Sequence, residues 1–131
     1  MTATDIALAV AFLLVFSPVQ ACGVCNEDKV AATYDHAIVR RATLQGRVMV
    51  FCEVRGTFDS RRLKAAASRI SGIDAASLRT SANPATVSFA LDDYRQSPQS
   101  AVNALQAAAP KGTELVILQV QGLAAAPSRR H

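Results

Sequence analysis

Two of the three cysteines are separated by only two residues, in the segment Cys22-Gly23-Val24-Cys25. Two thiolates at this spacing can converge on one soft metal ion such as Cu(I), and a neutral imidazole can complete a trigonal or tetrahedral ligand set. The one histidine away from the C-terminus, His36, follows eleven residues after Cys25. The candidate metal ligands are therefore Cys22, Cys25 and His36.

His36 also has a simpler interpretation. In a continuous helix, eleven residues correspond to three turns, or about 16 Å along the axis. His36 then reaches the ion only if the cysteine segment folds back or if the helix begins later than expected. Otherwise it is a surface histidine beside Asp35.

The same pair of cysteines is compatible with thiol–disulfide chemistry, since Cys-x-x-Cys before a helix is also the arrangement of oxidoreductases. A helix N-terminus favours the thiolate, whereas Glu27 and Asp28 in the first turn oppose it. The strand that precedes the motif in such enzymes is missing from the pattern.

The sequence also has no Gly-rich phosphate loop, and Asp92-Asp93 is interpreted as a solvated turn. We therefore predict that the protein is not an enzyme.

The residues before the cysteines have the features of an export signal. Ile6 to Val15 is apolar, Ser17-Pro18 interrupts it, and Val19-Gln20-Ala21 offers small residues to a signal peptidase. The apolar run is too short for a transmembrane helix, which needs about 20 residues. Although Met1 to Asp5 lacks the usual Lys or Arg, we expect a signal peptide over residues 1–21 and a periplasmic location.

Val19-Gln20-Ala21-Cys22 also resembles a bacterial lipoprotein cleavage box, in which the cysteine after the cut is acylated. Gln20 departs from the small residues that are usual there. Acylation would anchor the chain to the membrane, facing the periplasm, and would prevent Cys22 from binding a metal or forming a disulfide. Without acylation, Cys22 with Cys25 is the economical disulfide pair, which leaves Cys52 as the odd cysteine.

The length and composition indicate one globular domain. The chain has 131 residues, of which 50% are hydrophobic and 18% charged, with a net charge of +4. The cations are scattered, as in Arg40-Arg41, Arg61-Arg62 and Arg129-Arg130, and there is no Trp. This pattern is typical of a solvated surface and does not favour nucleic acid as a partner.

Hydrophobic periodicity predicts a helix and then a strand after the cysteines. The helix covers Glu27 to Ala42, with Asn26 as its N-cap. The strand covers Arg47 to Val54, and its alternation places Cys52 on the same face as three valines. Cys52 is therefore expected to be a small buried hydrophobic residue.

Alternating helical and strand patterns continue to the C-terminus. In the third strand, Val87, Phe89 and Leu91 alternate with Thr86, Ser88 and Ala90, so we expect one face to be buried and the other to be in water. The later predicted elements are a helix from Asp59 or Ser60 to about Ile70, strands Ala75 to Ser81 and Ala85 to Leu91, a helix opened by Ser97-Pro98 and ending near Ala109, and a strand Glu114 to Val120.

This order of elements defines an α+β fold, the ferredoxin-like βαββαβ plan with a four-stranded antiparallel sheet. It occupies residues 47–122, after an N-terminal segment 22–46 that carries the Cys-x-x-Cys and the extra helix. That helix is expected on the open face of the sheet or at an edge. Residues 123–131 are expected to form a flexible tail.

In length and order of elements, Arg47 to Gly122 resembles the heavy-metal-associated domains of copper chaperones and metal-transporting ATPases. Gly72-Ile73 and Ser97-Pro98-Gln99 are similar to residues that recur in that family. The resemblance implies copper as cargo and a protein partner for metal transfer. The family's Cys-x-x-Cys lies in the loop after the first strand, but here that loop, residues 56–60, contains no cysteine. A metal site would have to be formed by the N-terminal segment.

The sequence thus favours an exported protein that binds a soft metal, copper in particular, through Cys22 and Cys25. The alternatives are a non-catalytic interaction module, anchored to the membrane only if Cys22 is acylated, and a thiol–disulfide protein.

Overall fold

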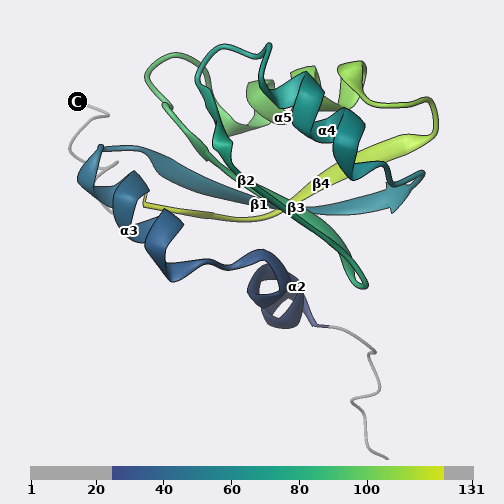
Figure 1. Ribbon diagram of the computed structural model, residues 1–131, viewed down its shortest axis with the longest axis horizontal. Coiled ribbons are helices and arrows are strands. Elements are labelled where there is room, and N and C mark those ends of the chain that lie inside the picture. Colours follow the sequence, from purple (N-terminus) through teal and green to yellow (C-terminus); the bar gives the residue numbers. More distant parts are fainter. Residues whose placement is uncertain (1–24, 123–131) are drawn as a thin grey trace, which may run out of the picture.

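The computed structural model describes residues 25–122. The predicted signal peptide, Cys22 and the predicted tail lie outside these residues. Two short helices precede a βαββαβ unit (Figure 1). The elements are α2 (Asn26–Thr33), α3 (His36–Leu44), β1 (Val48–Gly56), α4 (Ser60–Ala67), β2 (Ile73–Ala82), β3 (Ala85–Leu91), α5 (Pro98–Ala108) and β4 (Thr113–Gln121).

The four strands form one antiparallel sheet in the order β2-β3-β1-β4. Helices α4 and α5 lie on one face of this sheet, and α2 and α3 lie on the other (Figure 1). The prediction of an α+β, ferredoxin-like fold with an additional N-terminal helical segment is confirmed. Of the two positions considered for that segment, it occupies the open face.

The sheet separates two hydrophobic cores. The larger one lies under α4 and α5 and includes Cys52, whose alternation with the β1 valines was predicted. The smaller one lies under α2 and α3, where Met49 and Phe51 of β1 are 3% and 1% exposed. The central strand β1 is therefore buried on both faces. The smaller core consists of Val30, Ile38, Ala42, Met49, Phe51 and Ala90.

The expectation that one face of β3 is in water is wrong. Thr86, Ser88 and Ala90 are only 1%, 0% and 2% exposed. Their small side chains let α2 lie close to the sheet, and the Ser88 hydroxyl donates to the Thr33 carbonyl of α2 at 3.4 Å. The alternation of polar residues had suggested that this face of β3 contacts solvent. A backbone carbonyl of a packed helix, however, can accept a hydrogen bond from a small hydroxyl group as well as water does.

The prediction of one continuous N-terminal helix is also wrong. The chain leaves the helical conformation at Tyr34, whose backbone is extended (φ −70°, ψ 128°). The Asp35 carboxylate then accepts hydrogen bonds from the amides of Ala37 and Ile38, at 3.0 and 3.3 Å, and so caps a second helix. Asp side chains compete in this way with helix continuation. The N-cap of the first helix is Cys25, not Asn26.

The other helix starts agree with the sequence pattern. Asp59 and Ser97 are the N-caps of α4 and α5, and each accepts a backbone hydrogen bond within the first turn. α4 ends at Ala67, one turn earlier than predicted, and β2 begins at Ile73 rather than Ala75. Gly72 joins them with a positive φ of 94°, which favours glycine.

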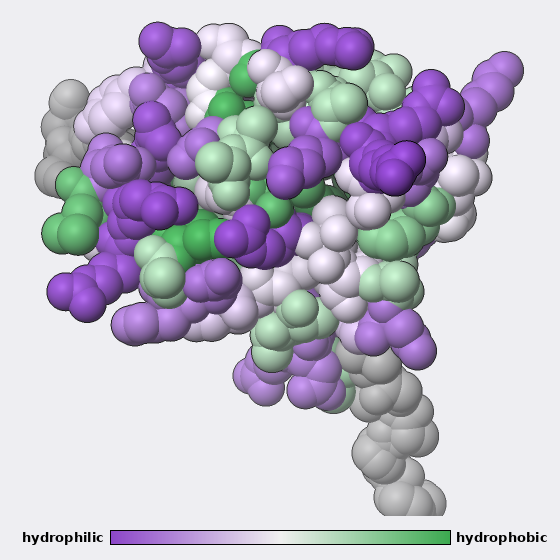
Figure 2. Space-filling model, in the orientation of Figure 1, coloured by the Kyte–Doolittle hydropathy of each residue, from purple (hydrophilic) through white to green (hydrophobic). Residues whose placement is uncertain are grey.

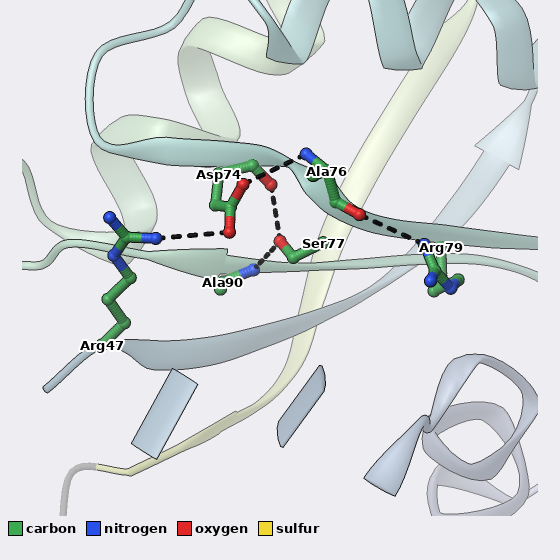
Figure 3. Close-up of polar contacts among 6 residues, drawn as sticks. All are labelled: Arg47, Asp74, Ala76, Ser77, Arg79 and Ala90. Atoms are coloured by element: carbon green, nitrogen blue, oxygen red, sulfur yellow. Dashed lines mark hydrogen bonds and ion pairs between the residues drawn. The ribbon is translucent and has the colours of Figure 1, made fainter. Parts of the chain in front are cut away.

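Strand β2 contains a large bulge where it pairs with β3. From Asp74 to Arg79 it advances five residues while β3 advances two, from Ala90 to Ser88. The buried Ser77 hydroxyl spans the irregularity: it donates to the Asp74 carbonyl at 2.6 Å and accepts from the Ala90 amide at 2.7 Å (Figure 3). Asp74 also pairs with Arg47 at 3.3 Å. Hydrogen bonds from side chains therefore replace the backbone hydrogen bonds that are missing between β2 and β3.

Hydrophilic residues cover most of the surface in the orientation of Figure 1, and hydrophobic residues form only small separate patches there (Figure 2). Within residues 25–122, none of the helices has the length and apolar character needed to span a membrane.

Candidate functional site

The described half of the cysteine pair lies at the start of α2. Cys25 is the N-cap residue, its side chain is exposed, and its carbonyl accepts from the Lys29 amide at 3.0 Å. Its side chain makes no capping hydrogen bond. Glu27 and Asp28 occupy the first turn, as expected from the sequence. The thiol is thus accessible at the positive end of a helix that also carries two carboxylates.

Cys22 lies outside the described residues. Three peptide units join it to Cys25, so the covalent chain keeps the two Cα atoms within about 11 Å of each other. This limit is compatible with a shared ion, and it follows from the sequence spacing alone.

His36 is the first residue of α3 and is exposed. The eight residues of α2 and the extended link at Tyr34 and Asp35 separate it from Cys25. Among residues 25–122, no three His, Cys, Asp or Glu side chains gather closely enough to hold a metal ion. The described residues therefore do not assemble Cys25 and His36 with a third ligand.

Cys52 belongs to a different environment. Its side chain is 0% exposed in the larger core, between the sheet and the helices α4 and α5. Burial raises the pKa of this thiol to about 12, because the surrounding hydrocarbon cannot solvate a thiolate. Cys52 is therefore unsuited to metal binding or disulfide exchange while the protein is folded.

Helix α2 is attached to the sheet by an ion pair that the sequence analysis missed. The Lys29 ammonium donates to the Glu53 carboxylate of β1 at 3.0 Å, and both side chains are about one-fifth exposed (19% and 21%). The hydrogen bond from Lys29 lowers the pKa of Glu53, and the charges of Lys29 and Arg55 act in the same direction against the opposing effect of burial. A signal was present in the sequence: Glu53 is an acidic residue on a strand face that also carries the apolar Met49 and Phe51.

A ring contact holds the C-terminal end of the same helix. Tyr34 stacks on Phe51, with ring centroids 6.4 Å apart and planes inclined by 8°. Tyr34 is nevertheless 44% exposed, so one side of its ring remains at the surface. Together with the Lys29 ion pair, this contact fixes α2, and with it the position of Cys25, relative to the sheet.

The molecule also has a polar hollow of about 440 Å³ between the β2 end of the sheet and the loop after β3. Its charged groups neutralise one another: Arg47 pairs with Asp74 at 3.3 Å, and Arg95 pairs with Asp92 at 3.8 Å. Asp92 also accepts from the Tyr94 amide at 3.1 Å, so it caps a turn, as predicted. These residues have structural roles that account for their charges.

No protein-family model, curated protein or solved structure matches this chain.

Proposed function

We propose that this chain is an exported protein that binds one Cu(I) ion through Cys22 and Cys25. The observation that supports this function is the difference in environment between the two described cysteines, Cys25 and Cys52. Cys25 is exposed at the start of α2, whereas Cys52 is buried with a pKa of about 12. Of the three cysteines, Cys22 and Cys25 therefore remain as the two thiolates for a soft metal.

The position of the pair suits a metal that is passed to a partner. Cys25 lies at the surface and at the end of a helix, on the face of the sheet opposite α4 and α5. A two-thiolate site that is open to solvent can exchange its ion with the thiols of another protein by successive ligand replacement. A protein partner for metal transfer therefore belongs to the proposal, as does a periplasmic location.

His36 is the third candidate ligand of this site. Since α2 separates it from Cys25, the imidazole joins the ligand set only if residues before Cys25 bring the ion to it. Two thiolates alone suffice for Cu(I), which accepts low coordination numbers.

Native mass spectrometry of the protein recovered from an export-competent host tests the proposal. We expect a mature chain that begins at Cys22 and, when kept reduced, binds one Cu(I). Cys22→Ser and Cys25→Ser should each abolish binding, while Cys52→Ala, a matched loss of one thiol, should retain it. Equal binding by all three variants would overturn the proposal.

Two further measurements complete the experiment: the Cu(I) affinity of a His36 variant and the mass of the mature chain. His36→Gln reports on the third ligand: a lower affinity for Cu(I) assigns the imidazole to the site, and an unchanged affinity assigns a two-thiolate site. A mass increased by lipid chains at Cys22, without bound copper, would instead support an anchored interaction module. That module would have to use sheet edges or helix surfaces, because α2 and α3 cover the open face of the sheet.

A further inference from the structure

The two edges of the sheet differ in how their backbones are protected. On β2, the Ala76 amide donates to the Asp74 carboxylate at 3.1 Å and the Ala76 carbonyl accepts from Arg79 at 3.3 Å (Figure 3). The bulge distorts the same stretch, and charged residues flank it. Bulges and charges of this kind prevent an edge strand from pairing with another chain. The β2 edge is therefore blocked.

The β4 edge has little of this protection. Its nine residues, Thr-Glu-Leu-Val-Ile-Leu-Gln-Val-Gln, include no proline, no cation and a single carboxylate, Glu114, near the beginning. The Gln106 side chain accepts from the Leu115 amide at 2.8 Å and so covers the start of the strand. Beyond it, no described side chain hydrogen-bonds to the backbone of residues 116–121. A one-residue bulge opposite Phe51 is the remaining irregularity.

Apolar side chains on this edge are only partly buried. Val116, Ile117 and Val120 are each of intermediate exposure, whereas the neighbouring β1 residues Val50 and Cys52 are 0% exposed. A long apolar edge without charges is an association site in soluble proteins, because it offers both unpaired backbone groups and hydrocarbon.

A groove runs beside the same edge. It has a volume of about 340 Å³ and lies between α2 and β4, with walls formed by Glu27, Val30, Ala31, Tyr34, Gln119 and Gln121. Tyr34, which is 44% exposed, lines this groove. An added strand could therefore pair with β4 and place alternate side chains against α2.

We infer that β4 pairs in antiparallel orientation with β4 of a second copy of this chain, giving a two-fold symmetric dimer with a continuous eight-stranded sheet. A two-fold axis at Leu118 sets Leu118 opposite its own copy and Val116 opposite Val120, while Ile117 faces Gln119. It also places the two Glu114 carboxylates at opposite ends of the paired strands, so like charges do not face each other. The strand is thus complementary to itself.

The blocked β2 edge explains why association stops at two copies. In the dimer, both outer edges of the joined sheet are β2 strands, whose bulges and side-chain hydrogen bonds at Ala76 and Leu78 disfavour pairing with a third copy. The interface is therefore closed and does not propagate into a fibre.

Sedimentation equilibrium of the chain tests this inference. The samples contain a reductant and a chelator, so that neither a disulfide through Cys25 nor a bridging metal contributes. We expect a reversible monomer–dimer equilibrium at micromolar concentrations. A monomer at all concentrations up to about 0.5 mM would overturn the inference.

Two isosteric variants locate the interface. Gln119→Glu puts a carboxylate at the centre of the proposed interface, beside Glu27, in both copies, and should raise the dimer dissociation constant about tenfold at low salt. High salt should restore much of the lost affinity by screening. Gln99→Glu, the same change at an exposed position of α5, should leave the equilibrium unchanged. Equal effects of the two variants would contradict the assignment to β4.

Discussion

The Lys29 ammonium lies 3.0 Å from the Glu53 carboxylate, and this contact joins α2, whose N-cap is Cys25, to the inner strand β1 of the sheet. It is a part-buried, charge-assisted hydrogen bond between residues 24 positions apart. Contacts of this kind stabilise a fold modestly, since each group gives up some hydration to form them.

Replacing Glu53 by Gln should change how stability depends on pH. Pairing with Lys29 lowers the pKa of Glu53 from its ordinary 4.5, so the folded state favours the ionised carboxylate. This stabilisation is present above about pH 4.5 and is lost as the pH falls through the lowered pKa. In urea unfolding at several pH values, Glu53→Gln should cost about 1 kcal/mol at pH 7 and much less at pH 3.

Glu114→Gln is the control for this measurement, because Glu114 is an exposed carboxylate on β4. It should unfold like the unmodified protein at both pH values. A loss of stability in Glu53→Gln that persists unchanged at pH 3 would show that the effect does not come from the ion pair.

The cysteines should differ sharply in reactivity. With a pKa of about 12 and no exposed area, Cys52 should react with a thiol reagent at pH 8 only when the protein unfolds. Cys25 is exposed and should react in the folded state. Mass spectrometry of peptides after a short labelling pulse distinguishes them, and rapid native labelling of Cys52 would contradict its burial.

Removing the Ser77 hydroxyl should destabilise the fold more than its size suggests. Ser77→Ala leaves both the Asp74 carbonyl and the Ala90 amide without their hydrogen-bond partner at a buried position. We expect a cost of about 2 kcal/mol in the free energy of unfolding. Hydrogen exchange at the Ala90 amide should accelerate in parallel.

Ser68→Ala is the matched control, since the exposed Ser68 hydroxyl makes one bond, to the Ala65 carbonyl at 2.7 Å. Its cost should stay within about 0.5 kcal/mol. Similar costs at both positions would argue against a special role for Ser77 in the bulge.

The break between the first two helices should depend on Asp35. Asp35→Ala removes the acceptor of two amide hydrogen bonds and should cost about 1 kcal/mol, whereas Asp35→Asn should retain most of the capping. Urea unfolding of the two variants gives the comparison. If Asp35→Asn is as unstable as Asp35→Ala, the exposed ion pair with Arg79 at 3.6 Å, rather than the cap, accounts for the effect.

Local signals in the sequence were sufficient for most of the βαββαβ unit. The bounds Ala85–Leu91 agree with the prediction residue for residue, and the Ser97-Pro98 helix start is confirmed, because alternation and capping act over a few neighbouring residues. Asp35 could be read as a mid-helix residue or as a cap, and the apolar spacing of Val30 and Ile38 concealed the break. Periodicity does not distinguish one helix from two that bury the same face.

These local sequence patterns do not predict contacts between distant segments of the chain. The burial of Ser88 depends on α2, and the Glu53 pKa depends on Lys29, so each requires knowledge of which face α2 covers. For the candidate site, the core position of Cys52 was predicted from the alternation in its strand. The relation of His36 to the cysteines required the helix break, which was not predicted.

The docking of α2 on β3 also has a consequence for synthesis. The contact between Thr33 and Ser88 spans 55 residues, and the ribosome adds about 5–20 residues per second, so roughly 3–11 s pass between the two ends of this contact. The surface that holds α2 is completed only later still, when β4 has been made. Cys25 therefore leaves the ribosome before the strands on which α2 docks, and an enzyme that modifies it meets an undocked peptide before it meets a folded protein.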